Sequence, residues 1–106
     1  MPSVKIKRGD TKRIIRDTLR YNGNGIDLTL ASSVHLVFKN NTTSSVVTRD
    51  ATTIDNAGNV TYQLVADDVA VSGDFFLEWH VNYSDGKTLV IPQDSYMQLL
   101  IMDDLR

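Results

Sequence analysis

Residues 73–87, GDFFLEWHVNYSDGK, decide the fold of this 106-residue chain. Every second side chain in the first part of the stretch is large and apolar: Phe75, Leu77, Trp79, Val81 and Tyr83. A period of two is the pattern of a β-strand with one face in a core. The Asp-Gly pair inside residues 84–87 is typical of a tight hairpin turn. We therefore predict a long strand over 73–83 that turns and returns over 87–91.

Similar alternation predicts further strands along the chain. Val34, Leu36 and Phe38 share one face of a strand over 33–39, and a half-buried strand is expected over 60–64. The remaining strand candidates are 4–7, 12–21, 46–48, 52–54 and 96–102. Single helical turns are expected within 29–32 and within 66–71. Asn- and Gly-rich turns at 22–25, 40–42 and 55–59 separate these segments.

The composition favours sheets over helices. The chain has 11 Val, 7 Ile and 10 Thr, and its 12 Asp stand against a single Glu. β-branched residues suit a pleated sheet, Asp suits turns, and Glu is a good helix former. About eight strands at intervals of 8–12 residues predict an all-β fold, an immunoglobulin-like β-sandwich of about 7–8 strands. We expect one domain over 1–106, without a disulfide because the chain has no cysteine.

Several classes of protein are excluded by the same counts. No run of 18 apolar residues is present, so we expect no membrane span, and the first residues lack the apolar segment of a secretory leader. A 42% apolar content with a net charge of −2 is enough to form a core and excludes disorder.

Positive charge is concentrated at the start of the chain, where residues 1–20 carry seven cations and two anions. Lys12, Arg16 and Arg20 share one parity of the 12–21 segment, opposite Ile15 and Leu19, and form a basic stripe. We select these three cations as candidate partner-binding residues. The alternatives are a solvated strand face or docking to an acidic partner, including another copy of this chain. Nucleic-acid binding is disfavoured because the chain is acidic and no aromatic residues interleave the cations.

No constellation for catalysis is visible. His35 and His80 both lie on the parity opposite the core residues of their strands, and the spacing supplies no converging partners. The pairs Asp67-Asp68 and Asp103-Asp104 are neighbours in sequence only, and capping and solubility explain them. We therefore predict no catalytic, cofactor or metal site, and a protein that is not an enzyme.

The order of these signals resembles the N-terminal immunoglobulin-like domain of phage baseplate upper proteins and related small domains of phage tails. The residues that carry the resemblance are Gly9-Asp10, Ile15, Leu19, the turn and strand 22–29, Ala31, Val34, Phe38, residues 57–60, Tyr62, residues 73–75, Trp79, residues 83–87, Pro92 and Tyr96. Leu30 and Lys12-Arg13 depart from the pattern of such sequences.

The resemblance implies a phage virion structural or assembly module of a tail or baseplate, located in the virion. Its partners would be other phage structural proteins or copies of itself, in a homo-oligomer such as a ring. The alternative is a carbohydrate- or cell-surface-binding β-sandwich that uses Phe76, Tyr83 or Tyr96 as stacking platforms. Neither function involves catalysis.

Overall fold

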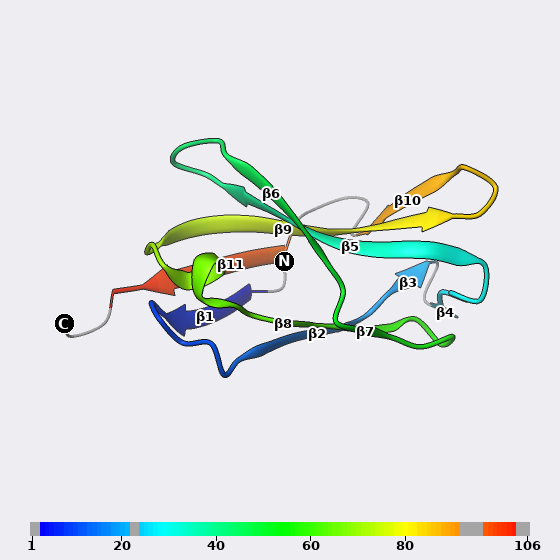
Figure 1. Cartoon of the computed structure of the whole chain (residues 1–106), viewed down its shortest axis with the longest axis horizontal. Helices are drawn as coiled ribbons and strands as arrows, with labels where there is room; N and C mark the ends of the chain where they lie inside the picture. The colour runs from blue at the N-terminus through cyan, green and yellow to red at the C-terminus, as the bar shows by residue number, and fades with distance from the viewer. Residues whose placement is uncertain (1–2, 22–23, 92–96, 104–106) are drawn as a thin grey trace.

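Two β-sheets face each other in the computed structural model, which describes residues 3–21, 24–91 and 97–103 (Figure 1). The larger sheet has six strands: β1 (Ser3–Lys7), β5 (Ala31–Asn40), β6 (Val46–Asp50), β9 (Gly73–Tyr83), β10 (Thr88–Ile91) and β11 (Met97–Met102). The smaller sheet has three strands: β2 (Ile14–Thr18), β7 (Thr53–Ile54) and β8 (Asn59–Gln63). A short ribbon pairs β3 (Arg20–Tyr21) with β4 (Asn24–Gly25).

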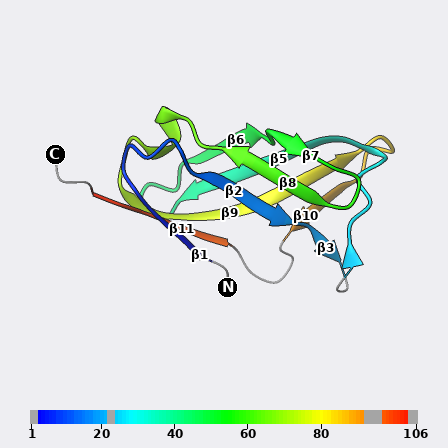
Figure 2. The same ribbon diagram turned by 90° about the horizontal axis from the view of Figure 1, so that it is seen from below.

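Strand β9 is the centre of the larger sheet. One edge of β9 pairs along nearly its whole length with β5. The other edge is shared, because β11 pairs with residues 73–77 and β10 pairs with residues 79–82. The order β1-β11-β9-β5-β6 follows, with β1 running parallel to β11 at the far edge. Viewed from below, β2 and β8 cross in front of β5 and β9 (Figure 2).

The chain changes sheets between β6 and β7. After β6 it passes from the larger sheet down to the smaller one, where β7 pairs with β8 (Figure 1). The 3-10 helix η1 (Ala66–Val69) then leads from β8 back to β9. This second crossing places η1 beside the β5–β6 hairpin at one end of the sandwich, and the candidate site described below lies there (Figure 1).

The core lies between the inner faces of the two sheets. Trp79 of β9 is completely buried, and Leu36 and Val81 are buried beside it in the same sheet. From the opposite sheet, Ile15 and Val60 point into the same cluster. The alternating apolar side chains predicted over residues 75–83 therefore all pack in or against this core.

The prediction of an all-β, immunoglobulin-like β-sandwich without a disulfide is confirmed. Eight of the strands have four or more residues, in agreement with the expected number. No helix within the described ranges is long and apolar enough to cross a membrane.

Some local predictions were wrong. The segment 12–21 is not one strand, because the chain breaks at Leu19, whose amide donates to the Gly58 carbonyl rather than to a neighbour in the β2 ladder. The expected helical turn at 29–32 is a tight turn closed by the Ala31 amide on the Leu28 carbonyl, and β5 starts two residues earlier than predicted. Pro92 and Tyr96 lie outside the described residues.

Candidate functional site: the Arg49–Asp68 pocket

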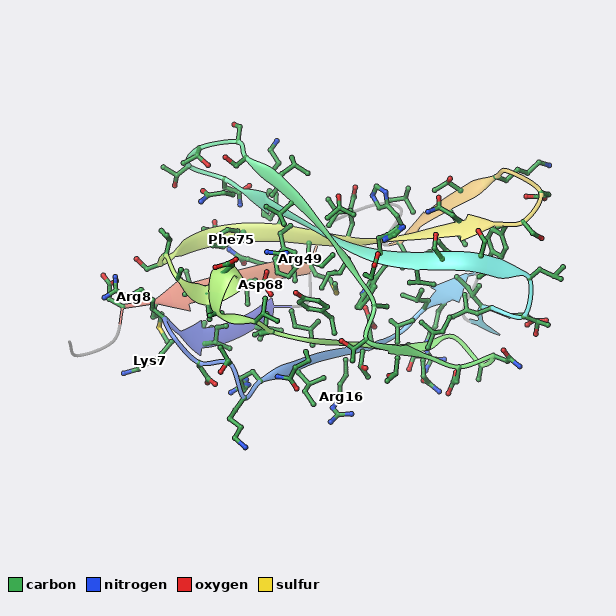
Figure 3. The ribbon with its side chains drawn as sticks, viewed as in Figure 1. Lys7, Arg8, Arg16, Arg49, Asp68 and Phe75 are labelled. Atoms are coloured by element: carbon green, nitrogen blue, oxygen red, sulfur yellow. The ribbon has the colours of Figure 1, made fainter. Side chains whose placement is uncertain are left out.

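A pocket of about 190 Å³ opens at the end of the sandwich, between the β5–β6 hairpin and η1. Figure 3 shows Arg49, Asp68 and Phe75 together at this place, although they come from three separate elements. The pocket has apolar, hydroxyl-bearing and charged walls. The residues used below are Phe38, Thr43, Ser45, Arg49, Asp67 and Phe75.

Asp68 is the anchor of the site. Its side chain is only 2% exposed, yet the residue carries a carboxylate. The two oxygens accept three hydrogen bonds: from Arg49 Nε at 3.0 Å, from the Tyr62 hydroxyl at 2.5 Å and from the Val65 amide at 3.0 Å. A buried carboxylate is tolerated only when it is paired and hydrogen-bonded in this way.

Arg49 is held by Asp68 through one nitrogen only. Its Cα partner in the sheet is the buried Leu36, so Arg49 lies on the inward-facing parity of β6, at the margin of the core. Among the contacts of the described residues, Nε is the guanidinium nitrogen that is engaged. The two Nη groups therefore keep their donors, on a side chain that lines the pocket and is about one-third exposed.

Tyr62 connects the Asp68 carboxylate to the core. Its ring packs edge-on against Phe38 with centroids 5.8 Å apart, and its hydroxyl donates to Asp68. Burial and the neighbouring Asp68 carboxylate raise the pKa of Tyr62 above its ordinary value of 10.0. The phenol consequently stays protonated at neutral pH and remains a donor to Asp68 there.

The local sequence explains how Asp68 reaches this position. Val65 is the N-cap of η1, and the Asp68 carboxylate accepts a hydrogen bond from its amide, which stabilises the start of this single 3-10 turn. Asp68 therefore does have the capping role that was predicted for the Asp67-Asp68 pair. The prediction missed the burial of that carboxylate and its pairing with Arg49, which lies 19 residues away in the sequence.

Only two of the three cations of the predicted basic stripe lie together in the structure. Arg16 and Arg20 line one shallow, open depression on the small-sheet side, together with Asp17. Lys12 lies apart in the loop before β2, where its amide donates to the Asp10 carboxylate. In Figure 3 the Arg16 side chain points away from the body of the molecule, on the side opposite the Arg49–Asp68 pocket. The role of these three cations in partner binding stays a prediction.

Asp17 lies between the two arginines and the core. Burial raises the pKa of the Asp17 carboxyl, and the hydrogen bond from the Thr18 amide, the nearby Trp79 indole and the positive charge of Arg20 oppose this increase. The indole of Trp79 lies near this carboxylate, but its buried Nε1 makes no hydrogen bond of normal geometry within the described residues.

The two histidines lie close together, which the sequence analysis did not foresee. His35 of β5 and His80 of β9 are direct partners in the antiparallel ladder, on the outer face of the larger sheet. His35 Nδ1 lies 2.8 Å from Asp50 Oδ1, and His80 Nε2 lies 2.9 Å from Glu78 Oε1. The spacing in the sequence did not indicate this pairing, because a period-two pattern fixes the face of a residue but not its cross-strand neighbour.

Comparison with known proteins supports the fold and nothing finer. No protein-family model matches the chain, and no curated protein matches its sequence. Among solved structures, CopC from Methylosinus trichosporium OB3b is similar, with a TM-score of 0.58 and 12% identity. The alignment covers 100% of this chain and 89% of that chain. At this identity the likeness establishes a shared β-sandwich architecture.

The expected role as a phage virion structural or assembly module is corrected by this comparison. CopC, the similar solved structure reported above, is not a phage tail or baseplate protein, and no family model supports a phage assignment. The residues that suggested such a role are mostly turn residues and alternating apolar residues. These positions report a sandwich fold, which unrelated proteins share.

Proposed function

We propose that this β-sandwich is a non-catalytic interaction domain that binds a carboxylate group of a partner protein in the Arg49–Asp68 pocket. The observation that carries the proposal is the single-nitrogen attachment of Arg49 to a buried Asp68. That attachment fixes the guanidinium plane while its Nη donors stay available. A planar pair of N–H donors matches a carboxylate in a bidentate geometry.

The size and walls of the pocket favour the end of a side chain or of a peptide. A volume of about 190 Å³ is below the roughly 300–1,000 Å³ typical of sites for small organic molecules. The Thr43 and Ser45 hydroxyls can accept or donate hydrogen bonds at the rim, and the rings of Phe38 and Phe75 can cover methylene groups. An acidic side chain or a chain terminus offers this combination of a carboxylate and a short apolar stem.

The charges at the rim favour a single negative charge. Asp67 lines the same pocket as Arg49 and lies in an exposed position. A monoanionic carboxylate can pair with the guanidinium at little cost from this second carboxylate. A phosphate with nearly two charges meets stronger repulsion from it.

The protonation chemistry of the pocket supports binding and not acid–base catalysis. An arginine does not give up its proton in a protein, so Arg49 cannot act as a general base. Both oxygens of Asp68 are already occupied by donors. The commitment of these groups to each other supports our proposal that this pocket binds a ligand and does not catalyse a reaction.

The proposal is tested by placing a negative charge in the pocket without disturbing the Arg49–Asp68 pair. Thr43 lies in the exposed turn after β5, so Thr43→Glu should fold and should block the site, whereas the neutral Thr43→Gln should not. Two peptide probes separate the sources of the carboxylate. One ends in a free carboxylate and has no acidic side chain; the other has an amidated end and one internal Glu.

We expect at least one probe to bind the wild type and Thr43→Gln with similar affinity in calorimetry. Thr43→Glu should bind about tenfold or more weakly, as expected for a like charge in a partly desolvated site. Equal binding of both probes to all three proteins would overturn the proposal, as would the absence of binding to the wild type.

A further inference from the structure

A second group of ionisable side chains lies on the outer face of the larger sheet, away from the Arg49–Asp68 pocket. It joins three adjacent strands: Asp50 on β6 is opposite His35 on β5, and His35 is opposite His80 on β9. Glu78 lies two residues before His80 on the same strand and therefore on the same face. We call these four residues the histidine pair cluster.

Each imidazole in the cluster has one nitrogen close to a carboxylate oxygen. His35 Nδ1 lies 2.8 Å from Asp50 Oδ1, an ion-pair contact without the geometry of a hydrogen bond, and His80 Nε2 forms a hydrogen bond with Glu78 at 2.9 Å. An imidazole has two nitrogens, so His35 Nε2 and His80 Nδ1 are left for another ligand. In metal proteins a ligating histidine commonly gives its other nitrogen to a carboxylate, which fixes the ring and increases its basicity.

The two rings also start from positions suited to a shared ligand. Directly opposite residues of an antiparallel pair have Cβ atoms about 4.5–5.5 Å apart, and their side chains project from the same face. Both histidine side chains are about one-third exposed or less, so they are reachable but partly immobilised by their neighbours. Less side-chain freedom is therefore lost when an ion binds.

We propose that His35 and His80 bind one divalent late first-row transition-metal ion through their unengaged nitrogens, with Asp50 and Glu78 as positioning residues. Imidazole nitrogen is a ligand that suits copper, nickel and zinc rather than magnesium or calcium. No set of three histidine or acidic side chains in the described segments is arranged to hold an ion. The site thus offers two protein ligands and leaves the other coordination positions to water.

The proposal predicts an order of affinities. For a site with nitrogen donors and open positions, binding should strengthen from Co²⁺ through Ni²⁺ to Cu²⁺ and weaken again at Zn²⁺. Calorimetry of the full chain with each chloride salt, in a buffer that does not chelate metals, measures this order. We expect one ion per chain and the tightest binding for Cu²⁺.

Variants assign the binding to the cluster. His35→Asn and His80→Asn should each weaken Cu²⁺ binding by at least about tenfold, because each removes one of two ligands. Asp50→Asn keeps both ligands and should weaken it by about tenfold, the lower end of the effect of removing a carboxylate that orients a ligating histidine. Lys39→Gln is the matched control, since Lys39 lies on the same face of β5 but has no ligating role, and it should bind as the wild type does.

A second readout locates the ion without relying on affinity. Substoichiometric Cu²⁺ should broaden the ¹H–¹⁵N amide signals of residues near positions 35, 50 and 80 and leave those of β1, at the far edge of the same sheet, sharp. Unchanged binding in both histidine variants would overturn the proposal, as would broadening centred elsewhere. Neither result would affect the carboxylate-binding pocket, which shares none of these four residues.

Discussion

Asp68 determines how one end of the sandwich closes. Replacing it with Ala removes the acceptor of three hydrogen bonds, two of them from uncharged donors and one from Arg49. A hydrogen bond to a charged group contributes about 1.5–3 kcal/mol, and water can satisfy some of the donors after the carboxylate is removed. We therefore expect Asp68→Ala to decrease the free energy of unfolding by about 3 kcal/mol. Urea unfolding measures this loss.

Tyr62→Phe is the matched control for that prediction. It removes one of the three donors and keeps the ring that packs on Phe38. The cost should be about 1 kcal/mol, since Asp68 retains its other two partners. A loss from Asp68→Ala no greater than that from Tyr62→Phe would show that the buried carboxylate is not the anchor described here.

Asp17 and Asp55 should respond to pH in opposite directions. Burial raises the pKa of Asp17 above its unfolded value of 3.8, so the folded state binds its proton more tightly. Ionised Asp17 therefore opposes folding at neutral pH, and Asp17→Asn should increase the melting temperature at pH 7. This gain should disappear as the pH falls below the unfolded value, where the carboxyl is protonated in both states.

Hydrogen bonds from the Asn59 side chain and amide lower the pKa of Asp55. The ionised form is favoured in the folded state, so its stabilising effect is present at neutral pH and is lost as the pH falls through the lowered pKa. Asp55→Asn should accordingly decrease the melting temperature at pH 7 and have less effect in acid. Thermal melts of both variants between pH 3 and pH 7 would contradict this account if the two changes had the same sign.

Two glycines in turns have the same backbone conformation but differ in the space available for a side chain. Gly58, before β8, and Gly86, in the β9–β10 hairpin, have φ values of +92° and +86°. A Cβ at Gly58 would lie 2.7 Å from the Leu19 carbonyl oxygen, whereas a Cβ at Gly86 meets nothing within 4 Å. Both substitutions carry the strain of a left-handed residue, about 1–2 kcal/mol, and only Gly58→Ala adds a clash with backbone.

We therefore expect Gly86→Ala to cost about 1 kcal/mol and Gly58→Ala about 3 kcal/mol or more. Chemical unfolding of the two variants compares them directly. Similar losses would mean that the close approach of the β7–β8 turn to residues 19 and 26 is not rigid.

The elements that could be predicted from sequence are those fixed by local patterns. The alternation that ends in Asp-Gly gave β9 with its observed bounds, Gly73–Tyr83, because both the period and the turn are encoded within 15 residues. The parallel pairing of β1 with β11 could not be predicted, since it joins residues more than 90 positions apart. The crossing between β6 and β7 likewise depends on the pairing of Thr53 and Ile54 with β8, and not on the pattern of their own exposed side chains.

The candidate sites were harder to predict for the same reason. Arg49 carries a visible signal, because it shares a parity with Val47 on β6 and is a charge on the inward-facing side of a strand. Its partner Asp68 could not be identified before η1 was placed beside β6. The histidine pair cluster required the register of three strands, which no single segment contains.

The two layers of the molecule share one apolar cluster, which contains buried residues of both sheets. Neither layer can lose its partner without exposing the core, so we expect a single cooperative unfolding transition. Trp79 fluorescence reports the centre of the larger sheet, and far-UV circular dichroism reports all strands. The two probes should give the same urea midpoint; a separate earlier transition by circular dichroism would show that the smaller sheet unfolds independently.

The measurement that tests the carboxylate-binding proposal most directly is an NMR titration of the wild-type chain, labelled with ¹⁵N, using the two acidic peptides. The Arg49 side-chain signals and the amides of Thr43 and Ser45 should shift together and saturate with one peptide per chain. Shifts confined to Arg16 and Arg20 would instead place binding on the small-sheet side. That result, or a spectrum that no peptide changes, would contradict the proposed role of the Arg49–Asp68 pocket.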